Sequence, residues 1–290
     1  MPDSQIPSGK FTAASGGSKQ QRATGLKQRE PGQHVPKLDP DPGAITLAGA
    51  LADALRPDFW PVAAICTVAC VSLGLQWFVG SERTFYDLFM SPREPYTAHW
   101  IFLYKAWWVA CVTSSFLLLP AVFVVLVPGL RLRDCNLSWR GFRDHFWLYV
   151  GLYAAVLPVI WLVSLTPNFT AYYPMYPLAG RSWSDLLAWE GMYIVQFVAL
   201  EFFFRGFLVG GLGRYLGILA VPASVMPYFM LHFTKLWPEA SASVVAGFVL
   251  GWLAWKTKSI WGGVMVHCAV AVSMDLLALS HKAQLPWLRR

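Results

Sequence analysis

An acid and a base stand four residues apart in the apolar stretch LEFFFRGF, which covers residues 200–207. If this stretch is helical, Glu201 and Arg205 lie on the same face and can form an ion pair. A charged side chain at the centre of a bilayer costs roughly 2.5 to 3.5 kcal/mol on insertion scales. The two residues are therefore expected either to pair for the sake of helix packing or to perform acid–base chemistry.

Two histidines in later apolar stretches extend this set. His232 lies in PYFMLHFTK, one helical turn after Tyr228, and His267 lies in GGVMVHCAVA. Glu190 precedes Glu201 by eleven residues, so on a helix both fall close to one stripe. A membrane histidine often serves only as a hydrogen-bonding group between helices. Together, however, these side chains predict a polar site inside a helix bundle, with Glu190 and Tyr228 as substrate-contacting residues.

The composition indicates that the surroundings of this site are a membrane. Of the 290 residues, 56% are hydrophobic and 13% are charged, which is unlike a soluble domain. The net charge of +7 comes from cations spread between apolar stretches, so we predict contacts with membrane lipids and no nucleic-acid partner. The five cysteines show no Cys-x-x-Cys spacing, which argues against a disulfide framework or a zinc cage.

Seven apolar windows come close to the length of about 20 residues that crosses a bilayer. The sequence therefore predicts an all-α, polytopic membrane helix bundle with about seven transmembrane helices, in a range of six to eight. The active site is expected in its C-terminal four-helix half. The windows cover residues 59–79, 106–127, 145–165, 186–212, 215–234, 240–256 and 258–280.

The chain divides into four parts on this basis. Residues 1–43 are rich in polar residues and predict a disordered tail. Residues 44–165 hold the first transmembrane helices, and a short interfacial helix at 44–59 comes before the first of them. Residues 166–185 form an extracytoplasmic aromatic loop, and residues 186–290 form the helix core that holds the site. Lysines and arginines in the tail and in the loops near 128–144 and 256–258 place the N-terminus in the cytoplasm.

The motifs of residues 186–280 resemble those of the CPBP intramembrane proteases, which include the prenyl-protein (CAAX) endopeptidases and bacterial Abi-type proteins. That family carries Glu-Glu-x-x-x-Arg on one membrane helix, Phe-x-x-x-His on the next and His-x-x-x-Asn on a later one. Here LEFFFR, YFMLH and HCAVA follow in the same order. The chain departs from the family at Leu200, Tyr228 and Ala271, where the family has glutamate, phenylalanine and asparagine.

The resemblance implies an intramembrane endopeptidase of the bacterial inner membrane that uses no metal cofactor. Its substrate would be a membrane-tethered protein or peptide, cleaved in C-terminal processing or at a sorting signal. Glu201 is then expected to activate water, held in place by Arg205. His232 would position the water or protonate the leaving amine. His267 would polarise the scissile carbonyl without the help of the asparagine.

Three alternatives follow from the same residues. Two imidazoles and a carboxylate can hold a catalytic zinc ion with an open fourth position, although the sequence contains no His-Glu-x-x-His motif. The changes at Leu200 and Ala271 also suit a non-catalytic binding or immunity protein. Polar residues on inward faces suit an ion-coupled transporter as well. Cleavage of a membrane-tethered substrate would distinguish the protease from the last two.

Overall fold

Every regular element in the described part of the chain is helical. The computed structural model describes residues 46–54, 56, 59–91 and 95–286. Within these ranges the exception is one isolated antiparallel bridge between Leu137 and Ser259. The all-α prediction is thus confirmed for the described residues, whereas the predicted disordered tail, residues 1–43, lies outside them.

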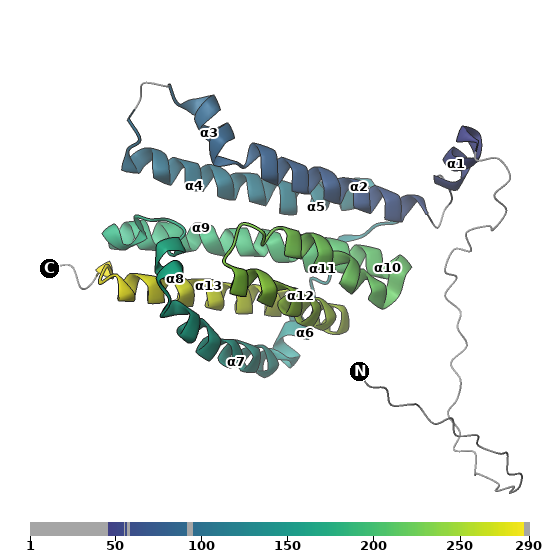
Figure 1. Cartoon of the computed structure of the whole chain (residues 1–290). Coiled ribbons are helices and arrows are strands. Elements are labelled where there is room, and N and C mark those ends of the chain that lie inside the picture. The colour runs from purple at the N-terminus through teal and green to yellow at the C-terminus, as the bar shows by residue number, and fades with distance from the viewer. Residues whose placement is uncertain (1–45, 55, 57–58, 92–94, 287–290) are drawn as a thin grey trace, which may run out of the picture. The chain divides into compact units, whose positions relative to one another are not determined.

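The N-terminal half contains a short first helix and two long apolar helical segments (Figure 1). Each long segment changes from α-helical to wider π-helical turns without a break in the chain. The sequence prediction places the second segment eight residues too late, because its first turns hold the polar residues of AHWIFLYK. The elements are α1 (Leu47–Ala54), α2 (Trp60–Gly74), η1 (Leu75–Val79), α3 (Glu82–Phe89), α4 (Ala98–Thr113), η2 (Ser114–Leu118) and α5 (Leu119–Leu126).

The C-terminal half contains the remaining long helices and the short helices that connect them. The elements are η3 (Leu132–Asp134), α6 (Trp139–Asp144), α7 (Phe146–Ser164), α8 (Pro167–Tyr172), η4 (Ala179–Arg181), α9 (Trp183–Glu201), η5 (Phe202–Gly211), α10 (Leu212–Leu216), η6 (Gly217–Leu219), α11 (Ala220–Met230), α12 (Trp237–Thr257) and α13 (Trp261–His281). The loop predicted at 166–185 therefore contains α8 and η4 and ends where α9 begins.

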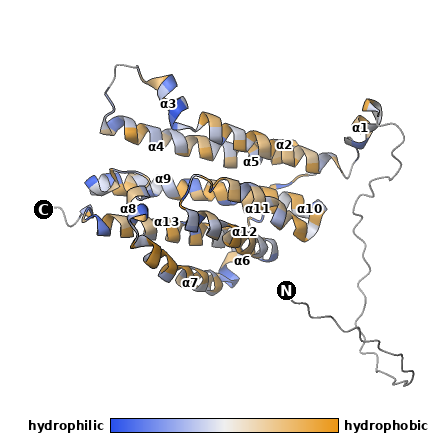
Figure 2. Cartoon of the chain, viewed as in Figure 1, coloured by the Kyte–Doolittle hydropathy of each residue, from blue (hydrophilic) through white to orange (hydrophobic). Residues whose placement is uncertain are grey.

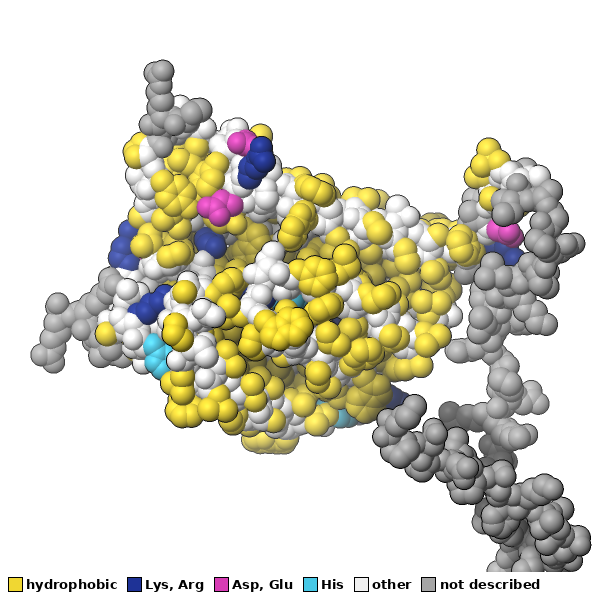
Figure 3. All heavy atoms as spheres, in the orientation of Figure 1, with side chains coloured by type: hydrophobic (Ala, Val, Ile, Leu, Met, Phe, Trp, Pro, Cys, Tyr) yellow, Lys and Arg dark blue, Asp and Glu magenta, His cyan; other side chains and the backbone are white. Residues whose placement is uncertain are grey.

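Five helical segments are long and apolar enough to cross a membrane: Trp60–Val79, Ala98–Leu126, Phe146–Ser164, Trp183–Met230 and Trp261–His281. Apolar residues follow one another along these helices in Figure 2, and hydrophobic side chains cover most of the visible helical surface in Figure 3. Such exposed apolar surface is expected where lipid is the solvent. Trp147 on α7, for example, is 79% exposed.

The fourth of these segments is folded back on itself. As a straight helix its 48 residues would measure about 72 Å, which exceeds the roughly 30 Å of a hydrocarbon core. Gly217 has a φ of +58°, a conformation that suits glycine, and here the chain reverses so that α11 packs against η5. The 21-residue α12 packs on both but is less apolar than the five segments.

The segment formed by α9 and η5 lies at the centre of the packing. All ten residues of η5 are buried, and it is contacted by α2, η2, α5, α11 and α12. Ser182 caps the start of α9, where its Oγ accepts a hydrogen bond from the backbone N–H of Asp185 at 3.1 Å. This central position explains how charged residues at the junction of α9 and η5 are kept away from lipid.

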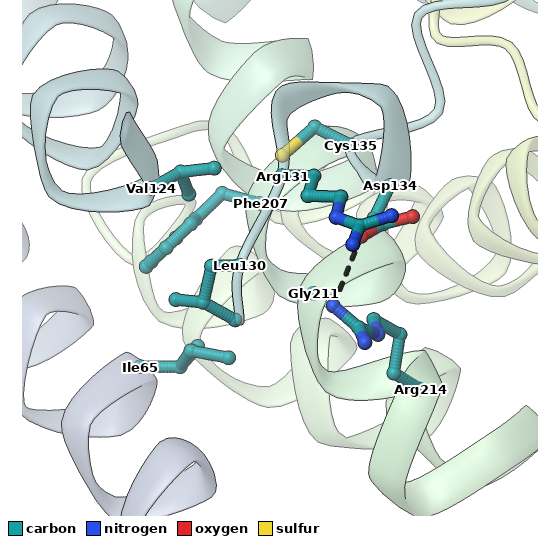
Figure 4. Close-up of a pocket in the computed structure, with 9 residues that line it drawn as sticks. All are labelled: Ile65, Val124, Leu130, Arg131, Asp134, Cys135, Phe207, Gly211 and Arg214. Carbon is teal, nitrogen blue, oxygen red and sulfur yellow. Dashed lines mark hydrogen bonds and ion pairs between the residues drawn. The ribbon is translucent and has the colours of Figure 1, made fainter. Parts of the chain in front are cut away.

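Two loops with basic residues meet at one end of the bundle. The backbone N–H of Ser138 donates to the carbonyl of Lys258 at 2.9 Å, so the loop before α6 lies beside the end of α12. The adjacent loop closes on η5 around a cavity of about 10 Å³, where Arg214 pairs with Asp134 at 3.0 Å (Figure 4). Burial raises the pKa of the Cys135 thiol to about 12, so this sulfur packs there as a neutral apolar group.

The opposite end of the bundle is covered by the aromatic segment between α7 and α9. Phe169, Tyr173 and Tyr176 are buried there against α9 and α13. The Lys282 ammonium donates to the carbonyl of Tyr173 at 2.7 Å, which ties the end of α13 to this segment. The C-terminal end of α13 therefore lies at the end opposite to the two basic loops.

Candidate active site

Glu201 and Arg205 form a buried ion pair at the junction of α9 and η5. Nη1 of Arg205 lies 3.3 Å from Oε1 of Glu201, and the side chains of Arg205 and Glu201 are 2% and 0% exposed. A buried ion pair is costly unless its geometry and further hydrogen bonds compensate for the lost hydration. The neighbouring helices therefore have to supply other polar partners for this pair.

His267 on α13 supplies the second partner of the carboxylate. Its Nδ1 lies 2.7 Å from Oε1 of Glu201, a short contact that is off the line of a regular hydrogen bond. The imidazole also stacks on Phe197 of α9, with the ring centroids 5.4 Å apart. The carboxylate thus faces a guanidinium on one side and an imidazole on the other.

Gly263 makes this contact between helices possible. It lies one turn before His267 on α13, and a Cβ atom at this position would collide with Oε2 of Glu201. The colliding atom belongs to a carboxylate that Arg205 and His267 already hold. The absence of a side chain at Gly263 therefore leaves the space that the Glu201 carboxylate occupies.

We expect Gly263→Ala to lower the free energy of unfolding by about 1–3 kcal/mol, since inserted atoms force a packed site apart. The contact between Glu201 and His267 should lengthen with it. Gly191→Ala on α9 is the matched control, since a Cβ there meets no atom within 4 Å. Unfolding measured in detergent micelles checks this, and equal stability of the two variants would contradict the tight fit.

Tyr228 on α11 connects the two histidines. Its hydroxyl lies 2.8 Å from Nε2 of His267, and its backbone carbonyl lies 2.8 Å from Nδ1 of His232. The Arg205 guanidinium carbon lies 4.2 Å from the centre of the Tyr228 ring, which is a cation–π distance. Five predicted site residues are therefore in one contiguous cluster. The sequence placed His232 within an apolar helical stretch, but it lies in the turn that follows α11.

Glu190 lies outside this cluster. It precedes Glu201 by eleven residues on α9, which is about 16 Å along the helix axis. Its two carboxylate oxygens are buried and have no hydrogen-bond partner within the described ranges. The prediction that it shares a stripe with Glu201 is compatible with α9, but the structure does not bring Glu190 into contact with the histidines.

A second buried polar group, which sequence reasoning missed, lies in the layer of Glu190. Asp275 on α13 is 0% exposed, and its Oδ2 accepts a hydrogen bond from Nε1 of Trp189 at 2.7 Å. Its Oδ1 has no partner among the residues described. The signal was present in the sequence, because an aspartate inside an apolar span is rare and needs an explanation.

The two departures from the motif pattern lie in apolar surroundings. Leu200 belongs to the core cluster that α9 and η5 form with α2, η2 and α5. Ala271 belongs to the cluster around Trp189 and Tyr193. Neither side chain therefore presents a polar atom to Glu201 and His267.

The donor set does not fit a zinc ion. In the described part of the chain, no group of three histidine, cysteine or acidic side chains converges in a metal-binding arrangement. Nδ1 of His267 faces Glu201, its Nε2 faces the Tyr228 hydroxyl, and Nδ1 of His232 faces a backbone carbonyl.

The comparisons with known proteins concern the helices that hold this cluster. Residues 182–273 match a family model described as type II CAAX prenyl endopeptidase Rce1-like, and this segment is a domain of that family. No curated protein and no solved structure matches the chain. The match runs from the cap of α9 into α13, so it includes the whole cluster as well as Glu190.

Proposed function

We propose that this protein is an intramembrane endopeptidase that cleaves a membrane-tethered protein or peptide. The observation that carries the proposal is the buried contact of Glu201 with both Arg205 and His267, inside a domain of a protease family. A carboxylate and an imidazole at 2.7 Å can remove a proton from water and return it to a leaving amine. No metal is required for this chemistry.

The exposure of the two groups favours His267 as the residue that meets water. Glu201 is 0% exposed, whereas 14% of the His267 side chain is accessible. The sequence alone suggested Glu201 as the base, but an acid buried between a guanidinium and an imidazole is better suited to act through the imidazole. Glu201 then keeps the proton of His267 on Nδ1 and stabilises the imidazolium that forms on proton uptake.

Arg205 and His232 have supporting roles in this mechanism. Arg205 holds the carboxylate of Glu201 in place and limits its movement. A neutral His232 that donates from Nδ1 to the Tyr228 carbonyl keeps a lone pair on Nε2. This lone pair can accept a hydrogen bond from the attacking water and so position it for His267.

The proposed function is tested by comparing the C-termini of membrane proteins from cells with and without this gene. A protease predicts fragments that depend on the wild-type chain and persist in the presence of a chelator. If no such fragments arise and no membrane-tethered test peptide is cut, the endopeptidase proposal is wrong. Substrates of the C-terminal processing and sorting-signal types are the first to examine.

We further propose that the bundle crosses a bacterial inner membrane seven times, with the N-terminus in the cytoplasm. The five long apolar segments support this, together with the reversal at Gly217 and the length of α12. A reporter fused near residue 136 should then report the cytoplasm, and one fused near residue 175 the other side. Both reporters on one side would contradict the seven-span arrangement.

A non-catalytic binding or immunity protein is the second candidate. It is favoured by the apolar surroundings of Leu200 and Ala271, which leave the cluster without the further acid and amide of the motif. This candidate predicts that biological function survives when the charge of Glu201 is removed. The match of residues 182–273 to a protease family argues against a transporter.

A further inference from the structure

Peptide hydrolysis needs a hydrogen-bond donor for the carbonyl oxygen, which becomes negatively charged when water adds. Three side chains around His267 can donate. The Arg205 guanidinium lies against the Glu201 carboxylate and the face of the Tyr228 ring, and the Nδ1–H of a neutral His232 donates to the Tyr228 carbonyl. The third is the Tyr228 hydroxyl, which lies 2.8 Å from Nε2 of His267.

We infer that the Tyr228 hydroxyl is the oxyanion donor of this site, and this inference rests on the proposed endopeptidase function. In the resting arrangement the hydroxyl donates to Nε2 of His267, the nitrogen that has to be free to accept a proton from water. A substrate carbonyl that takes over this hydrogen bond frees Nε2 at the same moment. Binding of the substrate thereby exposes the base.

The bonds and protons balance in the following sequence. Water gives a proton to Nε2 of His267, and its oxygen adds to the carbonyl carbon. The carbonyl oxygen becomes an oxyanion that accepts a hydrogen bond from Tyr228, which keeps its own proton. On collapse the C–N bond breaks, and the proton on Nε2 passes to the leaving amine. His267 and Tyr228 end in their starting states.

The packing of the tyrosine ring fixes where its hydroxyl can lie. The ring is 2% exposed and contacts the Arg205 guanidinium on one face. It also meets Phe204 edge to face, with 5.2 Å between centroids. These contacts involve the ring and not the hydroxyl, so Tyr228→Phe removes the donor and leaves the packing in place.

Cleavage kinetics and the ¹⁵N NMR resonance of His267 together test the inference. Removal of one oxyanion donor is expected to lower kcat by about 10²- to 10³-fold with little change in KM. Tyr153→Phe is the matched control, since its hydroxyl bonds Ser273 of α13 at 2.7 Å, outside the cluster. In full-length protein labelled with ¹⁵N-histidine in lipid nanodiscs, Tyr228→Phe should shift the Nε2 resonance of His267, whereas Tyr153→Phe should not. His267→Gln assigns that resonance.

The outcomes separate this inference from the function on which it rests. A wild-type chain that cleaves, with a loss of kcat in Tyr228→Phe alone, supports the oxyanion role. A wild-type chain that cleaves while Tyr228→Phe keeps kcat within about threefold overturns it and leaves the protease intact. An unchanged Nε2 resonance in Tyr228→Phe also overturns it. A wild-type chain that cleaves no membrane-tethered peptide overturns both.

Discussion

Glu201→Gln is expected to lower the cleavage rate by about 10³- to 10⁴-fold while the protein still accumulates in the membrane. Glutamine has the same shape but no negative charge, so it cannot stabilise an imidazolium at His267. Its amide can also donate to Nδ1, which favours the tautomer that carries its proton on the wrong nitrogen. The measurement is the rate of appearance of a cleaved terminus from a membrane-tethered substrate.

Glu239→Gln provides a matched control for this experiment. Glu239 pairs with Lys235 at 3.3 Å with an i,i+4 spacing, as Glu201 pairs with Arg205, but it lies outside the cluster. Its replacement should leave the rate nearly unchanged. His267→Ala should cost as much as Glu201→Gln, and the double variant little more, because residues that act as one unit are not additive. Full cleavage or full biological function with Glu201→Gln would favour the binding protein.

Arg205→Ala is expected to have the largest effect on stability, a loss of about 3–5 kcal/mol in the free energy of unfolding. The cause is the fully buried carboxylate of Glu201, which would lose its permanent cationic partner. Packing against Tyr228 would be lost as well. Arg205→Lys should lose less unfolding free energy than Arg205→Ala but still be less stable than the wild type, since an ammonium keeps the charge but not the planar contact with the ring. Reversible unfolding in detergent micelles gives these values.

The matched control for the arginine is Arg181, the last residue of η4, just before α9 begins. It forms an i,i+4 pair with Asp185 at 2.8 Å, but its side chain is 54% exposed. An exposed pair contributes about 1 kcal/mol or less, so Arg181→Ala should cost far less than Arg205→Ala. Equal losses in the two variants would show that burial of the Glu201–Arg205 pair has no special importance.

The sequence by itself determined the features that depend on local spacing and composition. The apolar windows identified the long helices, because a segment in lipid has to satisfy its own backbone hydrogen bonds. The four-residue spacing of Glu201 and Arg205 predicted an ion pair, since side chains one turn apart on a helix lie within reach of each other. The motifs identified the helices that match the protease family.

The tertiary structure decided which groups meet across different helices. The contact of His267 with Glu201 depends on how closely α13 approaches α9, and that approach depends on the absent side chain of Gly263. The contact of Tyr228 with His267 depends on the reversal at Gly217, which folds α11 back along η5. Such contacts join residues distant in sequence, so periodicity within one helix cannot predict them. For the same reason, the stripe that Glu190 shares with Glu201 did not place Glu190 beside the histidines, because the two acids are separated along the helix axis by about three turns.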